Sequence, residues 1–160
     1  MKKGLIWAIV LVAAIIFGMI LVIVQCSADE AFIQNVKLDV NGIVREELDF
    51  SAGLLKPNDS CKYKIIVKPS MEGNYVISFE FEEEHDGGLS RFIDVSISYE
   101  DTVVETTLAE LFAGKEVSFE GKLTMRKPAE IQVVFTMQDV GNEAQGTSTD
   151  FSAYLTATRN

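Results

Sequence analysis

The chain has 160 residues, with 14 Lys+Arg against 24 Asp+Glu and a formal net charge of −10. A chain this acidic is repelled by nucleic acid and by anionic lipid surfaces, so we expect no nucleic-acid partner. Two cysteines do not make a disulfide framework. The length predicts one domain, held together by core burial, plus an appendage.

The appendage is the N-terminal segment. After the basic start Met1-Lys2-Lys3, residues 5–24 (LIWAIVLVAAIIFGMILVIV) carry no charge. A helix of this length spans about 30 Å, the thickness of a bilayer core, whereas the apolar region of a secretory signal is usually about 7–15 residues long. We therefore expect a transmembrane helix at about 5–24, within a signal-anchor and short linker that cover residues 1–28.

Three fates of this helix stay open. It can be retained as an anchor, or it can be removed by cleavage after Ala28, because Cys26 and Ala28 put small residues at the −3 and −1 positions of that cut. Lipidation of Cys26 is the third reading, although Gln25 stands where a small residue is usual.

The flanking charges predict the orientation of the chain. Lys2 and Lys3 precede the span and Asp29 and Glu30 follow it, so the positive end stays inside and residues 26–160 face outward. Two of the basic residues precede the span, which leaves a net charge of −12 on the outward part. We expect a cell-membrane protein with an extracytoplasmic domain at 29–160, or a secreted or cell-surface form after cleavage.

The hydrophobic period changes to two after the span, which predicts strands. The first strand covers 32–40, and one of its faces carries five side chains of which only the second is polar: Phe32, Gln34, Val36, Leu38 and Val40. Asn41-Gly42 predicts a hairpin turn into a second, more charged strand over 44–50. The segment 54–60 contains Pro57 and Asx residues suited to a tight turn.

The remaining chain continues in the same style. A charged loop is expected at 82–88, and a short helical segment at 108–112 is stopped by Gly114. Further alternating strands are predicted at 61–67, ended by Pro69, and at 75–81, 93–99, 117–123, 131–137 and 151–157. About eight short strands and one short helix predict an all-β fold, an antiparallel two-sheet sandwich of jelly-roll type preceded by the N-terminal helix.

No catalytic constellation stands out. His85 is the sole histidine, and it lies in the acidic run Glu82-Glu83-Glu84-His85-Asp86. A zinc site usually needs several His or Cys ligands and a calcium site needs about six to eight converging oxygens, whereas consecutive residues of a strand point in alternating directions. We therefore predict a solvated loop here, and we assign no catalytic, cofactor-binding or metal-binding residue.

Cys61 begins an alternating strand. Pairing with His85 as a nucleophile has no support from a motif, whereas free cysteine is among the most buried residue types. We therefore expect Cys61 to be a small side chain that faces the core.

Two segments resemble the TasA/camelysin-like family of exported Gram-positive surface and biofilm-matrix proteins. The first, within 54–81, is similar to the family's L-x-P-G-D turn and outgoing strand, here Leu55-Lys56-Pro57-Asn58-Asp59. Asn58 replaces the usual glycine, and Asn tolerates a left-handed backbone. The second, 141–160, is similar to the family's closing loop and strand, with matching positions at Asn142, Gln145, Gly146, Phe151 and Ala157.

The resemblance implies a non-catalytic structural or adhesive role at a bacterial surface. Family members can form fibres in which the N-terminal strand of one subunit completes the sheet of the next, and they often end at the strand that here covers 151–157, so we expect this strand to complete the sandwich. The candidate donor strand is the one that carries Phe32, Val36, Leu38 and Val40; it can equally pair within its own domain, since consecutive strands usually do.

Partners follow from these expectations: the membrane through the N-terminal helix, other copies of the chain, or other surface proteins. The first alternative function is a monomeric binding module tethered to the membrane. The second is a surface metallopeptidase, because some camelysin-like proteins bear that name.

Overall fold

The computed structural model describes residues 31–40, 44–50, 56–144 and 146–160. Within these ranges no helix is long and apolar enough to cross a membrane. The predicted span at 5–24, the cleavage site after Ala28 and the lipidation site at Cys26 all lie outside the described residues, so they stay predictions.

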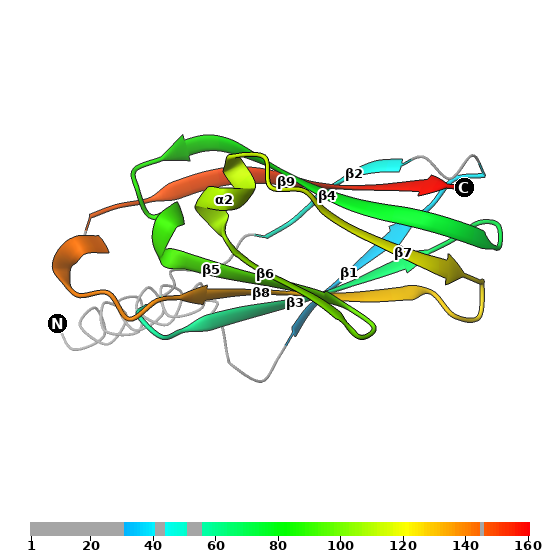
Figure 1. Ribbon diagram of the computed structural model, residues 1–160, viewed down its shortest axis with the longest axis horizontal. Helices are drawn as coiled ribbons and strands as arrows, with labels where there is room; N and C mark the ends of the chain where they lie inside the picture. Colours follow the sequence, from blue (N-terminus) through cyan, green and yellow to red (C-terminus); the bar gives the residue numbers. More distant parts are fainter. Residues whose placement is uncertain (1–30, 41–43, 51–55, 145) are drawn as a thin grey trace, which may run out of the picture.

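Two β-sheets face each other, as Figure 1 shows with one sheet above the other. The five-stranded sheet has the order β1 (Ala31–Lys37), β3 (Ser60–Lys68), β8 (Ala129–Met137), β5 (Ile93–Tyr99) and β6 (Thr102–Thr107). The four-stranded sheet has the order β2 (Val44–Leu48), β9 (Thr149–Arg159), β4 (Gly73–Asp86) and β7 (Val117–Leu123). This confirms the predicted all-β fold with two sheets.

The core lies between the sheets because alternate side chains of each strand point inward. The inward side chains of β3, β4, β5, β8 and β9 are almost completely buried, with Ile65, Ile77, Ile97, Ile131 and Leu155 each 0 % exposed. The period-two pattern of the sequence is therefore the pattern of burial, and it places the polar side chains on the two outer faces.

One pairing is parallel. β1 runs parallel to β3, from Ala31 opposite Lys62 to Lys37 opposite Lys68, whereas all other paired strands among the described residues are antiparallel. The predicted hairpin between 32–40 and 44–50 is wrong, because β1 and β2 lie in different sheets. The turn residues Asn41 and Gly42 lie outside the described residues.

Two further predictions need correction. The expected loop at 82–88 is largely strand, because β4 continues to Asp86 beside β9, with a bulge between Glu83 and His85. Strand β6 was not predicted, because it is an edge strand with two adjacent valines, and Val103 is 57 % exposed.

The short helix was predicted correctly. α2 (Leu108–Phe112) begins where the Thr107 side chain accepts a hydrogen bond from the Glu110 N–H, and Gly114 follows with a positive φ of 89°. Two single 3-10 turns, η2 (Ser90–Phe92) and η3 (Asn142–Ala144), are the other helical elements of the described residues. In Figure 1, α2 and η3 lie toward one end of the sandwich and the C-terminus lies at the other.

Candidate functional site: the edge strand and the adjoining cavity

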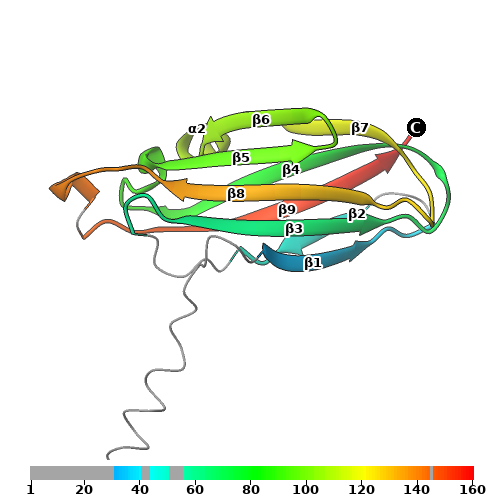
Figure 2. The ribbon, with the colours of Figure 1, turned by 90° about the horizontal axis from the view of Figure 1, so that it is seen from below.

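The candidate donor strand forms one edge of the five-stranded sheet. Figure 2 shows β1 beside β3 at the border of the molecule. The Leu38 N–H extends the pairing by donating to the Lys68 carbonyl at 2.9 Å. Of the four residues that mark the candidate donor strand, Val36 and Leu38 are buried, at 2 % and 1 % exposure. At the two ends of the stripe, Phe32 is 39 % and Val40 66 % exposed.

Gln34, the one polar member of the stripe, joins the two sheets. Its side-chain amide donates to the Asp49 carbonyl at 2.6 Å and accepts from the Asp49 N–H at 2.9 Å. Asp49 follows β2, which belongs to the opposite sheet. The amide thus imitates a strand neighbour and fastens β1 to the segment after β2. Sequence reasoning marked Gln34 as an exception but did not find its partner, which lies 15 residues away.

Aromatic contacts continue from β1 into the core. The ring centroid of Phe32 lies 5.4 Å from that of Tyr63, and the ring centroid of Tyr63 lies 4.9 Å from that of Phe50. The Tyr63 hydroxyl is buried and has no hydrogen-bond partner. Burial, and then the nearby charge of Asp49, raise the pKa of Tyr63 to about 12. These rings form the seat on which β1 packs. The seat therefore contains a buried hydroxyl that makes no hydrogen bond.

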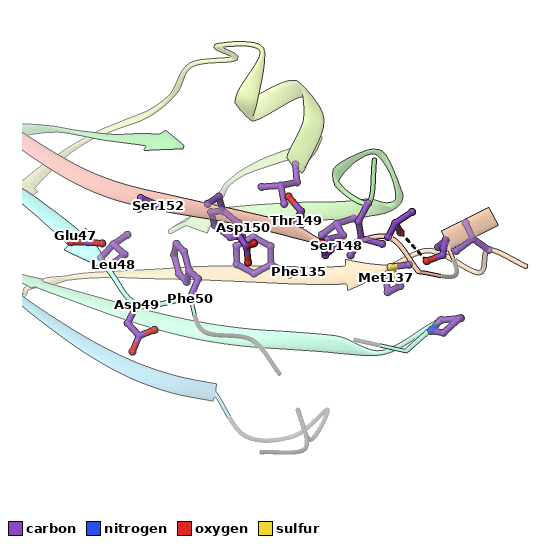
Figure 3. Close-up of a pocket in the computed structure, with 18 of the residues that line it drawn as sticks. Glu47, Leu48, Asp49, Phe50, Phe135, Met137, Ser148, Thr149, Asp150 and Ser152 are labelled. Atoms are coloured by element: carbon purple, nitrogen blue, oxygen red, sulfur yellow. Dashed lines mark hydrogen bonds between the residues drawn. The ribbon is translucent and has the colours of Figure 1, made fainter. Parts of the chain in front are cut away.

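A cavity of about 900 Å³ lies next to this seat. It is formed at one end of the sandwich by the last residues of β2 and β8, the first residues of β5, α2 and β9, and the loop before β9. Figure 3 shows the rings of Phe50 and Phe135 next to each other, whereas the carboxylate of Asp49 points away from them. The buried Thr149 hydroxyl, which also lines the cavity, has no hydrogen-bond partner. The cavity is thus mainly apolar inside.

The first family-like motif is a tight turn at the same end. The Lys56 carbonyl accepts from the Asp59 N–H at 2.9 Å, and Asn58 has a positive φ of 68°. This confirms the expected left-handed Asn58. The Asp59 carboxylate accepts from the Lys56 N–H at 3.2 Å and closes the turn. The turn is held to the end of β8, since the Asn58 N–H donates to the Met137 carbonyl. Leu55 lies outside the described residues.

The second motif divides between the two ends of β9. Asn142 lies in η3, Gly146 has a positive φ of 73°, and Phe151 packs against Phe135 at 5.9 Å between ring centroids. Ala157 is buried far along β9, opposite Ile77. Gln145 lies outside the described residues. Pro57, Ala144 and Phe151 all line the cavity, so the structure brings parts of both motifs together there and leaves Ala157 elsewhere.

The acidic run around His85 does not converge. Glu82 pairs with Arg45 at 2.5 Å, Glu84 accepts from the Ser152 hydroxyl, and Asp86 accepts from the Ser90 and Gly88 N–H groups of its own turn. Although burial opposes it, the hydrogen bonds from Ser90, Gly88 and Leu89 lower the pKa of Asp86. Across the described residues, no group of three or more His, Cys, Asp or Glu side chains is placed to hold a metal ion.

Cys61 is buried at 1 % exposure, as expected. It is not a free thiol, however, because it is disulfide-bonded. The sequence has one other cysteine, Cys26, which lies outside the described residues.

No protein-family model matches the chain, and no curated protein matches it. Among solved structures, it is similar to the pre-peptidase C-terminal domain of a collagenase from Bacillus anthracis, with 13% identity, a TM-score of 0.35, and 82% of this chain and 100% of that chain covered. It is also similar to PliG, a periplasmic inhibitor of g-type lysozyme. The Aeromonas hydrophila protein has 9% identity, a TM-score of 0.34 and 82% and 100% coverage. The Salmonella Typhimurium protein has 12%, 0.29, and 78% and 99%.

Proposed function

We propose that this chain is a non-catalytic structural or adhesive subunit of a bacterial surface, related to the TasA/camelysin-like proteins, whose copies assemble by strand addition. The observation that carries the proposal is the place of β1, which, among the described residues, pairs with β3 on one side only and forms an edge of the sheet. Edge strands are templates for pairing with another chain, and strand addition gains main-chain hydrogen bonds along such an edge.

The contacts of β1 are fewer than those of the inner strands. Five of its seven residues are exposed, namely Ala31, Phe32, Ile33, Asn35 and Lys37. Its pairing is parallel, which is slightly less stable per residue than antiparallel pairing. Lys37 also stands directly opposite Lys68, and like charges in that position are destabilising. These features support local release of β1 while the rest of the sandwich stays folded.

The same seat would accept β1 of a second copy. The Tyr63 ring and the Asp49 backbone offer the same contacts to β1 of either copy. Val36 of either strand can occupy the same buried position. Exchange therefore needs no new surface. Its extent would be governed by copy concentration and by the freedom of the segment that precedes β1.

The finer fold assignment is part of the proposal. Setting β1 aside leaves two four-stranded sheets, β2-β9-β4-β7 and β3-β8-β5-β6. Consecutive strands change sheets at every step except β5 to β6, and the last two strands lie between early ones. This order supports a jelly roll, in which eight strands form two Greek keys, with β1 as an added ninth strand.

We place the domain outside the cytoplasmic membrane, attached through the N-terminal helix or released by cleavage after Ala28. The apolar stretch at 5–24 and the charges at Lys2, Lys3, Asp29 and Glu30 support this placement. A released chain would begin at Asp29, two residues before β1. Other surface proteins are the second class of partner.

The cavity favours one alternative function, a monomeric binding module tethered to the membrane. Its volume of about 900 Å³ lies within the usual range for small-ligand pockets, about 300–1,000 Å³, and its wall is more apolar than polar. The metallopeptidase alternative has no comparable support, because the described residues hold no metal-ligand cluster.

The test of strand addition is the dependence of assembly on β1. We expect the native chain to form filaments or ladders in 500 mM NaCl, measured by electron microscopy and sedimentation velocity. Val36→Asp should abolish them, because Val36 is the buried residue of β1. Asn35→Asp is the matched control, since Asn35 is exposed on the same strand, and it should leave assembly intact. Equal assembly of both variants would refute strand addition, whereas a native chain that stays monomeric would favour the tethered binding module.

A further inference from the structure

Lysines gather on the outer face of the five-stranded sheet although the domain is acidic. The lysine strip consists of Lys37 on β1 with Lys62, Lys64 and Lys68 on β3. All four occupy outward positions, because their neighbours Val36, Tyr63, Ile65 and Val67 are buried. The strip therefore runs along the border between β1 and β3.

The lysine strip is only partly neutralised. Lys64 pairs with Glu130 at 2.6 Å, and Lys62 and the nearby Asp39 each have a partner of their own. In the part of the chain that the structure describes, neither Lys37 nor Lys68 makes an ion pair. Their register places them opposite each other, so two positive charges share this end of the strip.

Carboxylates gather on the opposite outer face. The acidic face consists of Glu47 on β2 with Glu80, Glu82 and Glu84 on β4. Arg45 lies among them, with its guanidinium 3.3 Å from Glu80, 2.5 Å from Glu82 and 3.8 Å above the Tyr154 ring. Glu80 and Glu82 keep 58 % and 48 % of their side-chain surface exposed. The face therefore stays negative despite the arginine.

The two surfaces are opposite in charge and similar in the spacing of their charged side chains. They lie on opposite outer faces of the sandwich, whose two layers are separate in Figure 1. Alternate residues of a strand repeat about every 6.6–6.8 Å. Lys62 and Lys64 have this repeat, and so do Glu80 and Glu82. A molecule can therefore not join the two surfaces within itself, but two molecules can.

We propose that the lysine strip of one copy binds the acidic face of a second copy, as a side-by-side contact between sandwiches. The contact is heterologous, because the two surfaces differ, so it can repeat without closing. This contact between copies rests on the proposed function, because both require an assembly of copies. It uses outward side chains, whereas strand addition uses the backbone of β1 and the inward Val36.

Salt separates the two kinds of assembly. Contacts between exposed charges are screened within a Debye length of about 10 Å at 0.1 M salt and about 3 Å at 1 M. We expect the full chain, in a non-ionic detergent, to sediment as larger species in 50 mM than in 500 mM NaCl. Strand addition, which relies on main-chain hydrogen bonds and apolar burial, should persist in both.

Charge reversal tests the surfaces directly. Lys37→Glu/Lys68→Glu and, separately, Glu47→Lys/Glu84→Lys should each abolish the low-salt species, and neither disturbs the Arg45 pairs. An equimolar mixture should restore it, because every contact in the mixture again joins opposite charges. Lys122→Glu/Arg126→Glu is the control, since it changes the net charge as the lysine reversal does but lies outside the strip.

Three results would overturn the inference: no salt-dependent association, association unaffected by either reversal, or no restoration in the mixture. A chain that stays monomeric but binds polyphosphate through the strip would assign the lysines to an anionic polymer, and would also overturn it. If only the low-salt species is absent, the proposal of strand addition is unaffected. If only the assembly in 500 mM NaCl is absent from the native chain, strand addition alone is refuted.

Discussion

Strands β9 and β1 share an alternating sequence but differ in how they are held. β9 lies between β2 and β4, and its inward side chains Ala153, Leu155 and Ala157 are each at most 1 % exposed. Within the described part of the chain β1 has one neighbouring strand, and the inward Phe32 is 39 % exposed. Alternation therefore indicates a strand, whereas neighbours on both sides determine how much the strand stabilises the fold. We therefore expect β9 to unfold only when the whole domain unfolds, and β1 to detach from β3 while the rest of the domain stays folded.

The largest expected effect is in β9. Leu155→Ala removes a side chain that is 0 % exposed, and core substitutions of this kind cost about 2–5 kcal/mol. Ile33→Ala on β1 should cost less than about 0.5 kcal/mol, since Ile33 is 63 % exposed and exposed substitutions have small effects. Denaturant unfolding of both variants measures the difference. Similar free energies of unfolding would refute the contrast between the strands.

The next effect is a pH dependence at Tyr63, in the seat of β1. Its folded pKa, about 12, is above the usual 10.0, so the folded state favours the neutral phenol. This stabilisation is complete below pH 10 and is lost as the pH rises toward 12. Tyr63→Phe has no such loss, and it should become more stable than wild type by roughly 2–3 kcal/mol at the upper limit of that range.

Stability of both proteins between pH 8 and 12 checks this prediction, with Tyr154→Phe as the control on an outer face. Parallel pH curves for wild type and Tyr63→Phe would show that the hydroxyl is not buried as described.

A smaller effect is expected at the Gln34–Asp49 contact. Gln34→Ala removes two hydrogen bonds, each worth about 0.5–1.5 kcal/mol net, so the opening of β1 should become easier by roughly 1–2 kcal/mol. Native-state hydrogen exchange measures it through faster exchange of the β1 amides. The β9 amides should not change, and neither should those of Asn35→Ala, an exposed neighbour.

The smallest effect is a gain. Lys68→Gln removes the like charge opposite Lys37 and should slow hydrogen exchange in β1, by an amount equal to about 0.2–1 kcal/mol. Lys122→Gln is the matched control on the other sheet. Faster exchange in Lys68→Gln would mean that Lys68 stabilises β1 rather than weakens it.

Local patterns predicted much of this fold. Period-two alternation located the core-facing residues of β3, β4, β5, β8 and β9, and Pro69 marked the end of β3 at Lys68. The left-handed Asn58 also followed from residue chemistry. These features depend on neighbours in the sequence, so the sequence alone suffices for them.

Partner choice could not be predicted in the same way. Asn41-Gly42 favours a hairpin, yet β1 pairs with β3 because β2 joins the opposite sheet. The acidic residues after Phe81 indicated a loop, but charged side chains can remain on a strand when one face of it meets water, as in β4. The contact between Gln34 and Asp49 likewise depends on how two sheets meet.

The central claim is that β1 of one copy can occupy the edge of another, and crosslinking between copies tests it most directly. A photoreactive amino acid replaces Ile33, which pairs with Lys64, in a tagged chain that is mixed with an untagged chain. We predict crosslinks from position 33 of the tagged chain to β3 of the untagged chain. The same group at Val103, exposed on the opposite edge strand β6, should give none to β3. Crosslinks from position 33 that stay within single chains at assembling concentrations would contradict the account.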